Sequence, residues 1–159
     1  MQLKRGCKGI WLVLPLLAAD RIAKQLAMAF LAPNGVKSAI PGVLSWAYAE
    51  NRGAAFSMMS GKNIFLIVLS ILLVAVLAVF LIRKPDANPL MRYGFWMVIA
   101  GGIGNLYDRI AYGFVVDFIR LDFVRFAIFN PADVFICLGA AFAAASVLAD
   151  EMKGKKKHG

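Results

Sequence analysis

The feature that most restricts the fold of this chain is a run of 20 residues without a charged side chain, from Asn63 to Ile82. In a lipid bilayer every backbone N–H and C=O must be paired within its own segment, and about 20 apolar residues in a helix cross the hydrocarbon core. Of the 159 residues in the chain, 61% are hydrophobic, compared with roughly half in soluble domains. The sequence therefore predicts an integral membrane protein.

Three further segments reach spanning length, so we expect an all-α membrane fold of four transmembrane helices in a single domain, 1–159. The N-terminus has basic residues before a short apolar stretch, as a signal peptide does. Apolar residues resume after Lys24, however, and we expect a full span instead. The expected spans are about 10–31, 63–82, 90–110 and 131–149, joined by long outer loops at 32–62 and 111–130.

The distribution of Lys and Arg predicts the orientation. Ten of these residues lie at the two termini and in the 83–92 connection, whereas five lie in the two long loops. Because cytoplasmic loops carry the excess of Lys and Arg, we expect both termini in the cytoplasm. The net charge of +9 is dispersed over helix ends, which argues against nucleic-acid binding.

The outer loops contain aromatic and apolar residues, which is typical of segments lying on the bilayer surface. In the first loop Trp46 and Tyr48 alternate with smaller residues, so we expect a short strand there and a small, partly β extracytoplasmic element. The second loop mixes large apolar side chains with charged ones and is also expected at the surface.

The chain is poor in catalytic residue types. Its only histidine is His158, in the basic C-terminal tail, which excludes Ser–His–Asp and Cys–His hydrolysis and a His-ligated zinc site. Cys7 and Cys137 fall at different depths, so a disulfide between them is not expected. Two chemistries remain open: carboxylate catalysis, or a Ser–Lys pair formed by Ser57 or Ser60 with Lys24 or Lys62.

The carboxylates lie where a charge is costly. Asp117 stands in FVVDFI, where apolar neighbours favour a raised pKa suited to acid–base chemistry. In NPAD, Asn130 can be the N-cap of the last helix and Asp133 can bond back to it, which explains Asp133 without catalysis. If the outer helix ends converge, the two aspartates could also share one proton.

Other ionisable residues have both structural and functional interpretations. Asp20 and Lys24 are spaced i,i+4, so they either neutralise each other inside the bundle or face a substrate. Asn105, Asp108 and Arg109 share one helix face, as a structural clasp or as catalytic groups. The preceding GGIG motif would let another helix or a substrate backbone approach closely.

Five sequence blocks together resemble the bacterial prolipoprotein signal peptidases, or signal peptidase II. They are DRIAK from Asp20, NRGAAFS from Asn51, GGIGNLYDR from Gly101, VVDF from Val115 and FNPAD from Phe129. The blocks cover almost the whole chain in the family's order and spacing. Two positions depart from the usual pattern: Arg52 stands where many members have Thr, and Ala23 where a hydroxyl residue is usual.

The resemblance implies an aspartyl endopeptidase of the bacterial inner membrane, working at the extracytoplasmic face without a metal or cofactor. Its substrates would be prolipoproteins, cut just before a Cys that carries diacylglycerol; membrane lipid would be a partner, globomycin an inhibitor, and the protein a monomer. The catalytic pair would be Asp117 and Asp133. Supporting and substrate-contacting residues would be Asp20, Lys24, Asn51, Gly53, Asn105, Asp108, Arg109, Asn130 and Ala132.

Two rival functions stay open. A Ser–Lys membrane protease would require a deprotonated lysine near one of the serines. A non-enzymatic subunit or permease would require a polar stripe through the full thickness of a helix, whereas the polar residues here cluster at one end.

Overall fold

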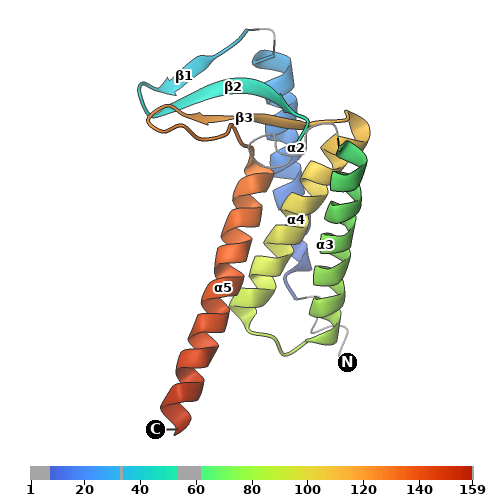
Figure 1. Ribbon diagram of the computed structural model, residues 1–159, viewed down its shortest axis with the longest axis vertical. Helices are drawn as coiled ribbons and strands as arrows, with labels where there is room; N and C mark the ends of the chain where they lie inside the picture. Colours follow the sequence, from blue (N-terminus) through green and yellow to red (C-terminus); the bar gives the residue numbers. More distant parts are fainter. Residues whose placement is uncertain (1–7, 33, 54–61, 159) are drawn as a thin grey trace.

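The computed structural model describes residues 8–32, 34–53 and 62–158, with the side chains of the last helix described up to Met152. In this part of the chain, long helices stand side by side and a three-stranded sheet lies across one end of them (Figure 1). The helical elements are η1 (Ile10–Leu12), α2 (Val13–Phe30), α3 (Asn63–Arg83), α4 (Pro89–Ala111) and α5 (Pro131–His158). The strands are β1 (Lys37–Ile40), β2 (Leu44–Asn51) and β3 (Val115–Leu121).

The helices correspond to the predicted spans. Among the described residues, α3 and the part of α5 from Pro131 to Met152 are each long and apolar enough to cross a membrane. The helices α2 and α4 are also long, but they carry charged residues that are buried inside the bundle. Helix α5 is longer than the span expected at 131–149: it continues to His158, so the basic tail extends the helix.

Helix α4 is the centre of the bundle and packs against α2, α3 and α5 (Figure 1). Its glycines allow backbone contact with α5, because a Cβ at Gly94 would collide with the carbonyl oxygen of Gly139 and one at Gly101 with that of Ala132. Small residues at such positions bring helix axes close together. Of the two partners considered for GGIG, the structure therefore places a helix against Gly101.

Adding a methyl group at Gly101 is expected to destabilise the bundle. Gly101→Ala would force the α5 backbone away at Ala132, whereas Gly102→Ala would meet only a methyl group of Val74, at 3.2 Å. We expect Gly101→Ala to lower the free energy of unfolding by about 1–3 kcal/mol and Gly102→Ala to have a smaller effect. Thermal unfolding of both detergent-solubilised variants tests this, and equal melting temperatures would contradict the packing described.

The sheet is antiparallel in the order β1-β2-β3. The predicted strand containing Trp46 and Tyr48 is confirmed as β2, but β3 was missed, because the second outer loop was interpreted only as a surface segment. In β3, Val116 and Phe118 pack with Ala27 and Leu31 from the end of α2, forming a small core beneath the sheet. The pairing of β3 with β2 sets Asp117 opposite Ala49 and holds it above the helix ends.

Candidate active site

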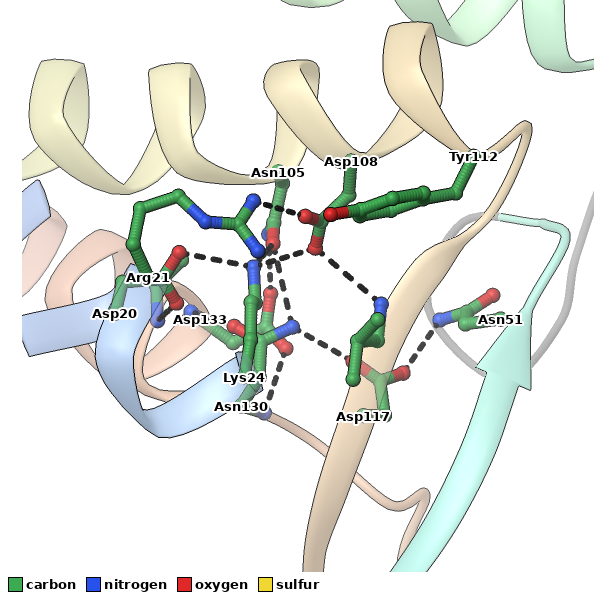
Figure 2. A network of polar contacts seen from close by, with 12 residues as sticks. Asp20, Arg21, Lys24, Asn51, Asn105, Asp108, Tyr112, Asp117, Asn130 and Asp133 are labelled. Atoms are coloured by element: carbon green, nitrogen blue, oxygen red, sulfur yellow. Dashed lines mark hydrogen bonds and ion pairs between the residues drawn. The ribbon is translucent and has the colours of Figure 1, made fainter. Parts of the chain in front are cut away.

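Charged and amide side chains converge where the C-terminal halves of α2 and α4 and the start of α5 meet the sheet (Figure 2). The structure brings all eleven residues singled out from the sequence into this one region. Eight contribute side-chain contacts to a shared polar network: Asp20, Lys24, Asn51, Asn105, Asp108, Asp117, Asn130 and Asp133. Gly53, Arg109 and Ala132 join at its edge through backbone groups or a guanidinium.

The sequence NPAD forms the predicted cap of α5. The backbone N–H of Asp133 donates to Asn130 Oδ1 at 3.1 Å, and the backbone N–H of Asn130 donates to Asp133 Oδ2 at 3.2 Å. This reciprocal pair satisfies N–H groups that a helix start leaves without intrahelical partners. It also fixes the Asp133 carboxyl group at the N-terminal end of α5.

Asp117 reaches the same place from β3. Its side chain is buried, and its two oxygens accept from Asn130 Nδ2 at 2.6 Å and from Asn51 Nδ2 at 3.0 Å. Burial raises the pKa of Asp117 to about 6, and the charge of Asp133 contributes to the rise; the two asparagine hydrogen bonds act in the opposite direction. A carboxyl group with this pKa exchanges protons near neutral pH.

Two asparagines connect the aspartates. Asn130 bonds Asp133 through its backbone and Asp117 through its side chain, so one residue holds both carboxyl groups. Asn105 donates from Nδ2 to Asp133 Oδ1 at 2.8 Å and accepts at Oδ1 from Asn130 Nδ2 at 3.2 Å. The convergence of the two aspartates, which the sequence left conditional, is therefore present (Figure 2).

Lys24 lies behind the asparagines and is fully buried. Its ammonium is 3.0 Å from Asp20 Oδ2, 2.8 Å from Asp108 Oδ2 and 2.9 Å from Asn105 Oδ1. Asp20 and Lys24 thus form an ion pair inside the bundle, and Asp108 joins it as a second acid. The ammonium of Lys24 is therefore directed at three oxygens of α2 and α4. Ser57 and Ser60, the serines considered for a Ser–Lys pair, lie outside the described residues, as does Cys7.

The predicted clasp between Asp108 and the adjacent Arg109 is wrong in its partners. Asp108 pairs with Lys24 and with Arg21, while Arg109 donates to the carbonyl oxygen of Gly53 at 2.6 Å. Adjacent residues on a helix point in different directions, which separates these two side chains. Arg21, which completes a group of two acids, Asp20 and Asp108, and two bases, was not singled out from the sequence. Arg21 follows Asp20 directly, and this position in a polar turn was the signal that could have identified it.

Two acids of the network also accept hydrogen bonds from backbone N–H groups. Asp20 Oδ1 accepts from the N–H of Ala132 at 3.1 Å, and Asp108 Oδ2 accepts from the N–H of Val116 at 3.3 Å. The first bond ties α2 to the start of α5, and the second ties α4 to β3. These acids therefore fix the two segments that carry Asp133 and Asp117.

Two cavities meet at the aspartates. One, of about 470 Å³, is mainly apolar and includes Asp133 together with Val134, Cys137 and Leu138 of α5. The other, of about 750 Å³, includes Asp117 and is lined by residues of β2, β3 and the following segment. Both volumes lie in the range of ligand sites. In the described part of the chain, no three His, Cys, Asp or Glu side chains are grouped as metal ligands.

Comparison with known proteins agrees with this arrangement. Residues 12–149 match the family described as Signal peptidase (SPase) II. The chain is 38% identical over 127 residues to the lipoprotein signal peptidase of Streptococcus thermophilus strain CNRZ 1066, covering 80% of this chain and 83% of that protein. The corresponding protein of Streptococcus pyogenes serotype M5 (strain Manfredo) is 38% identical over 124 residues, covering 78% and 82%.

Solved structures agree as well. A bacterial membrane enzyme determined by the in meso method at 2.3 Å resolution superposes with a TM-score of 0.85 at 28% identity, covering 91% of this chain and 89% of that one. A second, at 1.9 Å resolution, gives a TM-score of 0.81 at 28% identity, covering 90% and 94%. Fold, polar network and sequence similarity together show that this chain belongs to the signal peptidase II family.

Proposed function

We propose that this protein is an aspartyl endopeptidase that removes the signal peptide of prolipoproteins, cutting just before the diacylglyceryl-modified Cys. Family membership supports the substrate class. The observation that supports the aspartyl mechanism is the pair of carboxyl groups, Asp117 and Asp133, hydrogen-bonded to the same asparagine beside an apolar cavity. The supporting residues act by holding this pair.

In the proposed reaction a water molecule attacks the peptide carbonyl between the two carboxyl groups. Asp133 takes a proton from the water while Asp117, protonated, donates a hydrogen bond to the carbonyl oxygen and stabilises the charge that develops there. We place the proton on Asp117 because burial raises the pKa of its carboxyl group to about 6. The amine that leaves then accepts a proton from the pair, which returns to its singly protonated state.

We further propose that all four long helices span the bacterial inner membrane, with both termini in the cytoplasm and the aspartates at the extracytoplasmic face. The apolar surfaces of α3 and α5 and the excess of Lys and Arg at the opposite end support this orientation. Exposed apolar residues at one end of the sheet, Ile40, Val43, Phe123 and Val124, would rest on the bilayer surface.

The apolar cavity supports a lipid-modified substrate. It runs beside Asp133 and along Val134, Cys137 and Leu138 of α5, where an acyl chain or an apolar signal segment would remain out of water. Globomycin-type inhibitors would occupy the same space. One monomer would suffice for catalysis, since both aspartates and their supporting network come from one chain.

Ionisation of Asp117 should make thermal stability depend on pH. Its folded-state pKa of about 6 lies above the ordinary value of 3.8, so the folded state binds the proton more tightly. This contribution is complete below about pH 4 and is lost as pH rises through 6, which amounts to about 3 kcal/mol. We expect the melting temperature to fall between pH 4 and 7 by more in the unsubstituted protein than in Asp117→Asn; equal slopes would contradict the raised pKa.

Cleavage of a diacylglyceryl-modified prolipoprotein by the purified protein tests the proposed function. Mass spectrometry should find a new N-terminus at the lipidated Cys, and globomycin should block its appearance. An unmodified precursor of the same sequence is the control and should remain uncut. Cleavage elsewhere, or equal cleavage of the unmodified precursor, would contradict the proposal.

A further inference from the structure

The second, larger cavity is distinct in chemistry from the apolar one. Its lining residues come from the end of β2, strand β3 and the segment that joins β3 to α5. Its lining includes the charged residues Glu50, Arg120, Asp122 and Arg125 in addition to Asp117. The two cavities share five lining residues, including Asn51 and Ile128, so they adjoin on either side of the aspartates.

Three of the charged residues that line this cavity, Glu50, Arg120 and Asp122, form ion pairs. Asp122 binds Arg120 Nε at 2.9 Å, and the Ser45 hydroxyl that donates to Asp122 is the main cause that lowers its pKa and keeps it ionised. Glu50 binds Arg52 Nη2 at 2.8 Å. Among the residues that the structure describes, the Arg125 side chain makes no ion pair or hydrogen bond, and it is exposed. We call this cavity polar because four charged residues line it in addition to Asp117, and among them Arg125 is the one without an ion-pair partner in the described part of the chain.

A prolipoprotein has an apolar part and a polar part, which correspond in chemistry to the two cavities. The signal segment and the acyl chains before and at the modified Cys are apolar and stay in the membrane, whereas the chain after the Cys is polar and must leave it. If the scissile bond lies at the aspartates, the apolar cavity along α5 suits the first part. The adjoining polar cavity, which opens beside Asp117, is the exit that does not require a peptide backbone to enter lipid.

We propose that the polar cavity binds the residues that follow the lipidated Cys, and that Arg125 makes the enzyme prefer acidic over basic side chains there. This inference rests on the proposed peptidase function. The cation is exposed, so the interaction is that of a surface ion pair: worth a few-fold in rate and weakened by salt. Arg125 is a specificity residue and takes no part in the bond cleavage.

The test compares three diacylglyceryl-modified peptides that differ only at the three positions after the Cys, which are acidic, neutral or basic. The measured quantity is the ratio of kcat/KM for the acidic peptide to that for the basic one, in an uncharged detergent. We expect a ratio of about two to five at low salt that approaches one near 1 M NaCl. Using a ratio within each variant removes any change in folding or basal rate.

Arg125→Gln should bring the ratio to about one, and Arg125→Glu should invert it. Lys37, an exposed basic residue on β1 that does not line the cavity, provides the matched control: Lys37→Gln should keep the ratio of the unsubstituted protein. A preference that survives Arg125→Glu, or that Lys37→Gln abolishes equally, would overturn the inference. Cleavage of the neutral peptide tells the two proposals apart: its absence overturns the peptidase function, whereas cleavage with no charge preference overturns only the role of Arg125.

Discussion

Asp117→Asn is expected to lower kcat for prolipoprotein cleavage by about a hundred- to ten-thousandfold, the range lost when an acid–base group is removed. The amide has nearly the same shape as the carboxyl group, and its oxygen can still accept from Asn130 Nδ2. Its NH2 group replaces the oxygen that accepts from Asn51 Nδ2, so one hydrogen bond is lost. The amide has no acidic proton, so it cannot replace the protonated carboxyl group that stabilises the charge on the carbonyl oxygen of the substrate. The substrate KM should change little.

The folding control for this variant is its stability. The amide is neutral, like the protonated carboxyl group of the proposed reaction, and it buries no charge at any pH, which offsets the lost hydrogen bond from Asn51. Asp117→Asn should therefore melt close to the unsubstituted protein. A loss of activity with retained melting temperature supports a catalytic role. Activity above half of the original value, in a protein that melts normally, would contradict it.

Lys24→Met is expected to have the largest effect on folding. The lysine is fully buried, and its ammonium neutralises two equally buried acids, Asp20 and Asp108. Removing one partner of a buried ion pair leaves an uncompensated charge and costs about 3–5 kcal/mol. We expect a melting temperature lower by roughly 6–20 °C, since about 2–4 °C correspond to each kcal/mol in a chain of this size.

The matched control is Lys84→Met, at an exposed lysine after α3, which should melt like the unsubstituted protein. Lys24→Met combined with Asp20→Asn removes the charge of Asp20, while Asp108 keeps Arg21 as a partner, so the double variant should recover part of the lost stability. No recovery would show that the effect comes from packing alone. Because Lys24 also bonds Asn105, which donates to Asp133, the recovered protein should still cleave more slowly than the unsubstituted one.

Some of this structure follows from local sequence. The charge-free run before Arg83 defines α3, and NPAD defines the start of α5, because spans and caps depend on residues close together in the chain. The strand β3 was missed, since its large apolar residues are equally typical of an interfacial loop. Its assignment needed β2 as a pairing partner, which is far away in sequence.

The polar network shows the same limit. The sequence offered Asp20 as a partner of Lys24, and the structure contains this ion pair, but the sequence did not identify Lys24 and Arg21 as the partners of Asp108. The actual pairing depends on how closely α2 and α4 approach, and this approach depends on Gly104, where a Cβ would come within 2.6 Å of Asp20 Oδ2. Arg21 and the two cavities also arise from the packing of helices and strands, which no local pattern encodes.

A double-mutant cycle tests whether Asp117 and Asp133 act as one catalytic unit. Cleavage of diacylglyceryl-modified prolipoprotein would be measured for Asp117→Asn, Asp133→Asn and the double variant, with enzyme in excess so that residual rates are visible. Catalytic groups that act together lose their effect with the first substitution. We predict that each single variant loses at least about a hundredfold and that the double variant loses little more. Losses that multiply in the double variant, or full activity in either single one, would contradict a shared catalytic pair.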